Sequence, residues 1–421
     1  MTTTSNPLPQ PTPLHRGVSF LAMFTDSSVD LLEDLRVRWR KVADALSRRS
    51  SGAALLATSR VNLFYLSGRV YRGYAYLPAE GGEPLFLVRR PLGLEGANVR
   101  YFHRADEIPE ILAEAGYPPP SELLLEDAEV SHADYLGLAT VFSAATLSGV
   151  SGSSLLRRLR AVKSPYEISQ IEYGGKKQAE GFARFPSLYR PGMTDQEFTV
   201  AIFGYMMREG SLGIVRSYGM TMEGFIGQVL VGENGGGMSP YDYALGGTGF
   251  SRALPVGQCG VVIQPGDAVQ CDIPGNFNGY ISDSTRTYYR GQLSAKARDA
   301  HQCSIDILDA VAEAAVPGAS CEALYQMSLR MADAAGFADM FMGGRQKARF
   351  VGHGTGLYVN ESPVLGARSR DVLQEGMVIA VEPKFVIPGA GAVGCEDTFV
   401  VTEKGARCLS ESPRGLMPLP E

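Results

Sequence analysis

Histidine is rare in this chain, with five residues among 421. Chemistry that depends on imidazole must therefore come from this small set. Cysteine is also scarce: the chain has six, all in its second half, and no two form a CxxC pair. This spacing disfavours a zinc site of the usual cysteine pattern and indicates buried thiols of a cytoplasmic protein.

Basic residues are not in excess: the chain has 39 Lys and Arg and 45 Asp and Glu, which gives a net charge of −6. Nucleic acid is therefore not an expected partner. The sequence also lacks an apolar run of the roughly 18 residues that a membrane-spanning helix needs, so no membrane partner is expected. Residues 1–17 have neither the charged nor the apolar region of a signal peptide, and we expect a flexible tail there.

Glycine and proline are abundant, with 49 and 25 residues spread along the chain, which indicates many turns. The length argues for two or three domains. Residues 18–162 are expected to form an N-terminal α/β domain. Its helices are predicted at 29–49, 108–115 and from 133, and its strands at 53–58, 63–66, 73–77, 84–88 and 123–125.

Residues 163–421 are expected to form a second, α+β domain. Ser164 and Glu167 make a capping box with Pro165 at the first helical position, and Thr194 and Glu197 repeat this signal. Two more helices are predicted at 294–316 and 320–335. Strands are predicted at 268–273, 280–289, 378–382 and 398–402. Paired helices and hairpins of this kind favour one curved antiparallel sheet.

The first candidate site residues are Asp272 and Asp283. The turn-rich residues 274–279 separate their strands, which can fold back and bring the two carboxylates together. Two unpaired carboxylates in apolar surroundings repel each other and lose solvation, and a bound cation relieves both costs. Taken alone, either aspartate is explained as well by a turn or a helix cap.

Three further residues strengthen the case for a metal site. His353 lies between glycines in Gly352-His353-Gly354, Glu382 follows an apolar strand, and Glu396 follows a glycine-rich turn. Each alone is explained by a core histidine or by an acid that faces solvent. Together the five residues supply four carboxylates and one imidazole. The four negative charges balance the charge of two divalent cations.

The order of these residues resembles a known family. It runs Asp, ten residues, Asp, then Gly-His-Gly-x-Gly, then Glu-Pro, then Glu-Asp-Thr. This order is similar to the metallopeptidases that include methionine aminopeptidase, Xaa-Pro aminopeptidase and Xaa-Pro dipeptidase (prolidase), with creatinase as a metal-free relative. The likeness covers about residues 160–410, and residues 62–68 resemble the creatinase-type N-terminal domain. The resemblance implies an α/β creatinase-like N-terminal domain followed in the chain by an α+β pita-bread catalytic domain.

The resemblance also implies a cofactor and a mechanism. Two divalent ions are expected, with Mn(II) first and Co(II), Zn(II) or Fe(II) as alternatives. Asp272 and Asp283 would hold one ion, and Asp283, His353, Glu382 and Glu396 the other. A hydroxide that bridges the ions would attack the carbonyl of an amide C–N bond, with Glu382 shuttling the proton. The expected substrate is a small peptide or small amide, and the expected assembly is a homodimer.

The sequence departs from the family pattern at three places. Family peptidases carry a histidine about eleven residues before Gly266-Asp267, where this chain has residues 253–256, Ala-Leu-Pro-Val. They carry a second one where Asn360 stands, and an arginine where Gly394 stands. Asn360 can donate a hydrogen bond but cannot transfer a proton. The candidates to replace these donors are Tyr241, Tyr243 and Arg252, whereas His301 is expected to be a surface or core residue.

Three functions are compatible with these features. The first is a metal-dependent hydrolase of the Xaa-Pro peptidase type. The second is a non-peptidase enzyme on the same fold, either a creatinase-like or ectoine-hydrolase-like amidohydrolase or a lyase, which has less need of the missing histidines. The third is a binding scaffold without activity. Retention of all five ligands argues against the third, because converging carboxylates without a metal reduce stability.

Overall fold

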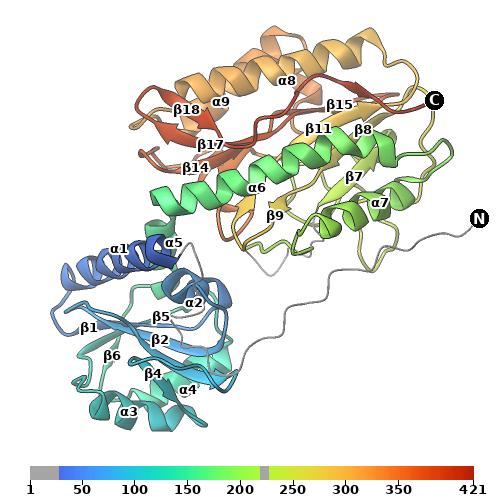
Figure 1. The fold of residues 1–421 in the computed structure, drawn as a ribbon. Coiled ribbons are helices and arrows are strands. Elements are labelled where there is room, and N and C mark those ends of the chain that lie inside the picture. The colour runs from blue at the N-terminus through green and yellow to red at the C-terminus, as the bar shows by residue number, and fades with distance from the viewer. Residues whose placement is uncertain (1–27, 219–226) are drawn as a thin grey trace, which may run out of the picture. The chain divides into compact units, whose positions relative to one another are not determined.

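A computed structural model describes residues 28–218 and 227–421, so the predicted tail at 1–17 lies outside the described residues. The chain divides into two compact units, Met1–Leu156 and Arg157–Glu421 (Figure 1). The division falls within helix α5 (Gly152–Ala161). We retain residues 162 and 163 as the proposed domain boundary, because the chain leaves α5 there before the next helix begins.

The first unit contains a mixed six-stranded sheet in the order β4-β3-β2-β1-β5-β6. Helix α1 has the predicted amphipathic pattern, and its Leu35, Val42 and Leu46 are buried. The α/β character expected for this region is confirmed. The elements are α1 (Ser28–Ser47), β1 (Ala53–Ala57), α2 (Arg60–Ser67), β2 (Arg72–Pro78), β3 (Leu85–Arg90), β4 (Val99–Tyr101), a 3-10 turn (Ala105–Glu107), α3 (Ile108–Glu114), β5 (Glu122–Leu125), α4 (His132–Val141) and β6 (Thr146–Leu147).

The strand predicted at residues 63–66 is wrong, because this segment lies within helix α2. Ser59 caps that helix by accepting a hydrogen bond from Asn62 N (3.2 Å). Gly68 ends it with φ +67°, and its N–H donates to Phe64 O. A short apolar run fits a buried helix as well as a strand, and here the two caps decide between them.

The described residues of the second unit form four main helices, and both predicted capping boxes begin helices. The Ser164 side chain accepts from Glu167 N, and Thr194 accepts from Glu197 N. The helices are α6 (Pro165–Arg184), α7 (Asp195–Arg208), α8 (Ala295–Ala314) and α9 (Cys321–Ala334), with 3-10 turns at Phe185–Leu188, Glu233–Gly236 and Ala338–Met340.

The strands of the second unit form two larger sheets, where the sequence predicted one. Their orders are β19-β11-β8-β7 and β13-β12-β14-β17-β18, and β15-β16 and β9-β10 form separate pairs. A bridge between Thr285 and Glu396 links the two sheets. The strands are β7 (Gln228–Val231), β8 (Ala268–Asp272), β9 (Gly275–Asn276), β10 (Ile281–Ser282), β11 (Thr285–Tyr289), β12 (Phe350–Gly354), β13 (Glu361–Gly366), β14 (Val378–Val381), β15 (Lys384–Ile387), β16 (Gly391–Gly394), β17 (Asp397–Thr402), β18 (Gly405–Cys408) and β19 (Met417–Pro418).

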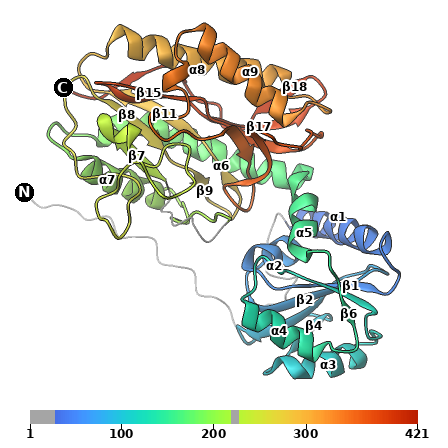
Figure 2. The same ribbon diagram turned by 180° about the vertical axis from the view of Figure 1, so that it is seen from behind.

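Helices cover these strands on two sides (Figures 1 and 2). Helices α8 and α9 lie along one side, and α6 and α7 along the other. Each pair has its own apolar core. Ile307 of α8 belongs to the same core as Phe385 of β15, and Phe198 of α7 to the same core as Cys271 of β8. The junction of the two sheets therefore lies between two helical layers, where side chains are shielded from water.

All six cysteines are free, and four of them are buried. Among the helices in the described part of the chain, none is both long enough and apolar enough to cross a bilayer.

Candidate metal centre

Strands β8 and β11 bring the first two candidate ligands together. They pair antiparallel, and Asp272 at the end of β8 faces Thr285 at the start of β11. The strand predicted at 280–289 is interrupted, and Asp283 lies in the break between β10 and β11. Asp283 N donates to Thr398 Oγ1 (2.7 Å), which donates to Asp283 O (2.8 Å). These two bonds tie the Asp283 backbone to β17 of the other sheet.

His353 lies on β12, where its glycine neighbours allow close backbone approach. A Cβ atom on Gly352 would lie 2.3 Å from Ala380 O, and one on Gly354 would lie 2.2 Å from Ser362 O. No larger residue fits at either position without moving a strand. The glycines thus let β13 and β14 pack tightly on both edges of β12 and hold His353 in place.

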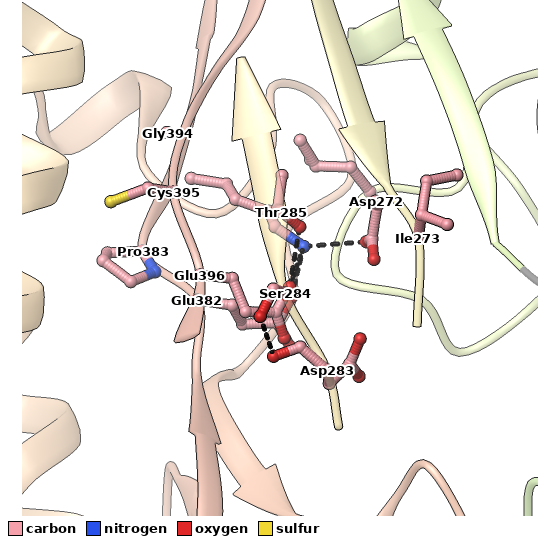
Figure 3. A network of polar contacts seen from close by, with 12 residues as sticks. Asp272, Ile273, Asp283, Ser284, Thr285, Glu382, Pro383, Gly394, Cys395 and Glu396 are labelled. Atoms are coloured by element: carbon pink, nitrogen blue, oxygen red, sulfur yellow. Dashed lines mark hydrogen bonds and ion pairs between the residues drawn. The ribbon is translucent and has the colours of Figure 1, made fainter. Parts of the chain in front are cut away.

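Glu382 and Glu396 lie at the two ends of the hairpin formed by β15 and β16. Glu382 follows β14 directly, and Glu396 lies between β16 and β17. Figure 3 shows Asp272 on one side of the site and these two glutamates on the other. His353 Nε2 lies 3.4 Å from Glu382 Oε1 and 3.9 Å from Asp283 Oδ2. The structure therefore brings all five predicted ligands into one cluster.

The donor atoms of the cluster form two groups of three. One group is Asp283, His353 and Glu396, and the other is Asp272, Glu382 and Glu396. Within each group the donor atoms lie within 4.8 Å of one another. Carboxylate oxygen and imidazole nitrogen are ligands that suit divalent ions such as Mn(II) and Zn(II).

Lys384 is a member of the cluster that the sequence analysis missed. Its Nζ donates to Asp272 Oδ2 (2.9 Å), Glu382 Oε2 (2.6 Å) and Glu396 Oε2 (3.1 Å). Its side chain is 0% exposed. A signal was present in the sequence: a lysine opens an otherwise apolar strand two residues after a proposed ligand, at the spacing that places side chains on one face.

Two carboxylate oxygens of the cluster lack a partner. Asp283 Oδ1 and Glu396 Oε1 are buried and have no hydrogen-bond partner among the described residues. A buried anionic oxygen without a donor is costly, and a bound cation removes that cost. Both oxygens belong to residues of the group that contains His353, so this group fits a divalent ion.

The protonation of the cluster without a metal reflects crowding of negative charge. Burial, reinforced by the Asp272 charge, raises the pKa of Asp283 to about 7. Burial and the Asp283 charge also raise the pKa of Glu396 well above its usual range. Burial disfavours the charged form of Glu382 as well, but Lys384 and His353 outweigh it and lower its pKa to about 2. Glu382 therefore stays ionised more readily than Asp283 or Glu396.

His353 responds to the same surroundings. Burial by itself would lower its pKa, but the hydrogen bond and charge of Glu382, together with the Asp283 charge, raise its pKa to about 9. A divalent ion requires the neutral imidazole, so binding an ion here would displace a proton.

Buried side chains around the cluster hold Glu396 in position. Thr285 Oγ1 donates to Glu396 Oε2 (2.7 Å), and Arg286 Nη1 donates to Glu396 O (2.7 Å). Arg286 also pairs with Asp397 (2.7 Å), and both side chains are 0% exposed. Contacts of this kind orient a ligand before any ion binds.

A cavity of about 220 Å³ opens beside the cluster. Of the predicted substrate-binding residues, only Tyr243 lines it among the described residues. Burial and the charges of Asp272 and Asp283 raise the pKa of Tyr243 to about 12, so its phenol remains protonated. Tyr241 lines a neighbouring pocket, and Arg252 is exposed on a loop outside both.

Asn360 also lines the cavity, but its side chain is engaged with the backbone. Its Oδ1 accepts from Tyr218 N (2.8 Å), and its Nδ2 donates to Tyr218 O (3.5 Å). This contact accounts for an asparagine there without a role in proton transfer. A catalytic role for Asn360 stays a prediction.

The structure also locates the departures from the family pattern. His353 is the one histidine among the described residues that line the cavity. His301 is buried on α8, where its Nε2 lies 2.7 Å from Arg414 O, as expected for a core histidine. Gly394 has φ +144°, and a Cβ atom there would lie 2.6 Å from Pro383 O. The backbone at this position therefore leaves no room for an arginine.

Together, the ligand cluster and the fold define a metal-dependent hydrolase. The chain belongs to metallopeptidase family M24, whose profile matches residues 169–403. The profile of the creatinase/prolidase N-terminal domain matches residues 38–162. The predicted family, the pita-bread fold with a creatinase-like N-terminal domain, and the enzyme class are confirmed.

Individual relatives agree with this membership. The Xaa-Pro dipeptidase of Pyrococcus furiosus is 27% identical over 91% of this chain and 100% of its own length. Two solved structures share the fold with a TM-score of 0.73. They are an Xaa-Pro dipeptidase from Bacillus anthracis (22% identity; 91% of this chain and 100% of that one) and an X-Pro aminopeptidase from Thermotoga maritima (19% identity; 90% and 98%).

Proposed function

We propose that this chain is a metal-dependent hydrolase of the Xaa-Pro peptidase type that cleaves an amide C–N bond in small peptides. The observation that carries the proposal is the buried cluster of Asp283, His353 and Glu396 beside a cavity of about 220 Å³. The unpaired oxygens Asp283 Oδ1 and Glu396 Oε1 support a cation at this place. The names of the dipeptidase relatives support the substrate class.

Different residues of the site are proposed for proton acceptance and for hydrogen-bond donation to the substrate. A divalent ion held there would polarise a carbonyl group and lower the pKa of bound water toward neutrality. Glu382 is the proposed proton acceptor, because it lines the cavity and Lys384 holds its Oε2 in place. The Tyr243 phenol, which stays protonated, is the proposed donor to the substrate.

A second candidate function is a non-peptidase amidohydrolase on the same fold. The observation that favours it is the lack of a second imidazole at the cavity among the described residues. Asn360, at the place of one family histidine, is bonded to the Tyr218 backbone. A smaller or more reactive amide would depend less on proton donation to its leaving nitrogen.

A substrate panel separates the two functions. We expect Xaa-Pro dipeptides to be hydrolysed in the presence of Mn(II), with activity lost in chelator and restored by added metal. The panel should include longer Xaa-Pro peptides and small cyclic and guanidino amides. Turnover of the small amides without cleavage of any peptide would instead identify the second function.

Replacing Tyr243 by Phe tests the proposed donor. Loss of one hydrogen bond to the substrate is expected to lower kcat/KM about fivefold, because a neutral hydrogen bond contributes roughly 1 kcal/mol. Steady-state kinetics with an Xaa-Pro dipeptide measures this. Tyr173, half exposed on α6, provides the matched Tyr173→Phe control. Equal kinetics in both variants would remove Tyr243 from the mechanism.

Other expectations stay predictions. These are Mn(II) as the metal, the homodimer, the cytoplasmic location, and substrate contacts by Tyr241 and Arg252.

A further inference from the structure

We propose that the ammonium group of Lys384 permanently occupies one of the two cation places in the cluster, and that this protein binds a single divalent ion at Asp283, His353 and Glu396. The inference rests on the metal dependence proposed above. It differs from the two-ion expectation, and it assigns to Lys384 the role of a built-in cation.

The contacts of Lys384 coincide with one donor group. Its three hydrogen bonds reach Asp272, Glu382 and Glu396, at 2.6 to 3.1 Å. These are the three residues of the second group of candidate metal ligands. A lysine ammonium has three donors, and here each one has a carboxylate acceptor. An ion placed among the same three oxygens would have to displace this ammonium.

The position of Lys384 leaves its side chain little freedom to move. Its backbone pairs with Gly394 across β15 and β16, and on the other side Met342 N donates to its carbonyl oxygen (2.8 Å). Its side chain is 0% exposed. Moving the ammonium to solvent would therefore require repacking of the surrounding core rather than a change of rotamer.

The other group of candidate ligands, Asp283, His353 and Glu396, has carboxylate oxygens that no hydrogen-bond donor of the described residues occupies. Lys384 makes no hydrogen bond to Asp283 or His353 among the described contacts, and the buried Asp283 Oδ1 and Glu396 Oε1 lack partners. One half of the cluster is thus saturated by a side chain, and the other half presents free ligand atoms. Glu396 belongs to both groups: its Oε2 accepts from Lys384, and its Oε1 has no hydrogen-bond partner among the described residues.

The charge balance agrees with one ion. The lysine charge offsets one of the four carboxylates, and a divalent ion would offset two more, leaving one negative charge. A second divalent ion beside a retained lysine would make the buried cluster cationic. Two cations and an ammonium within a few ångströms would repel strongly in a buried site.

Metal stoichiometry tests the proposal without reference to activity. Purified full-length protein is stripped with chelator, dialysed against excess Mn(II) and then against a low Mn(II) concentration, and bound metal is measured by mass spectrometry. We expect one ion per chain for the native sequence and two for Lys384→Ala, in which the second place is vacated. Lys163, a buried lysine bonded to Glu361 outside the cluster, provides the control Lys163→Ala, which should retain one ion.

The outcomes distinguish the two proposals. Two ions in the native chain, or one ion in Lys384→Ala, would overturn the built-in cation. No bound ion in any variant would overturn the metal-dependent function itself. If Lys384→Ala does not fold, electron paramagnetic resonance of the Mn(II)-loaded native protein decides: isolated Mn(II) supports the proposal, and a spin-coupled pair refutes it.

Discussion

Replacing Glu382 by Gln is expected to lower kcat by about 10²- to 10⁴-fold, the contribution usual for a positioned proton acceptor. The side chain lies between His353 Nε2 (3.4 Å) and Lys384 Nζ (2.6 Å), and these neighbours lower its pKa to about 2. Glutamine keeps the size of the side chain but cannot accept the proton. Turnover of an Xaa-Pro dipeptide at saturating Mn(II) measures the effect.

The control for this experiment is Glu375→Gln, at an exposed position in the turn before β14. Metal content is measured in parallel, because Glu382 also lies within reach of an ion. A variant that retains its metal but loses turnover supports the proton-transfer role. Native turnover in Glu382→Gln would exclude that role.

Replacing Asp397 by Asn is expected to lower the free energy of unfolding of the catalytic unit by about 3–5 kcal/mol, because it leaves a buried arginine without its counter-charge. Asp397 accepts from Arg286 Nη2 (2.7 Å) and Arg414 Nε (2.6 Å). Asp397 and Arg286 are both 0% exposed. The loss should also loosen Glu396, whose carbonyl oxygen accepts from Arg286.

A second carboxylate that pairs with Arg414 provides a matched control. Asp309 also pairs with Arg414, but its side chain is 60% exposed, so Asp309→Asn should cost less than about 1 kcal/mol. Urea unfolding followed by far-UV circular dichroism measures both variants. The single tryptophan, Trp39, lies in the other unit and provides a separate fluorescence signal. Equal stability of the two variants would contradict the burial argument.

Local signals in the sequence were sufficient for much of the fold. Ser164 with Glu167 and Thr194 with Glu197 predicted two helix starts, and the structure has both capping boxes. Local signals failed at residues 63–66, where a four-residue apolar run suited either a helix or a strand. They also failed to separate one sheet from two, because the bridge from Thr285 to Glu396 joins residues 111 positions apart.

Some residues of the candidate site could be predicted from the sequence, and others could not. The five candidate carboxylate and imidazole ligands could be predicted because their order along the chain is itself a pattern. Lys384 was missed because a lysine beside a strand is ordinary in a sequence, and only its contacts distinguish it. Tyr241 and Arg252 were proposed from a loop, and a sequence does not specify which loop side chains point into a cavity.

The sequence alone therefore determined the family, the two kinds of domain and the set of candidate metal ligands, because these follow from local propensity and from the order of motifs. The tertiary structure decided which charged side chains of the site contact one another. Only folding brings Asp272, Glu382 and Glu396 around the ammonium of Lys384, and leaves Asp283 and His353 outside its reach. Electrostatic energy depends on distances between residues remote in sequence, and packing sets those distances.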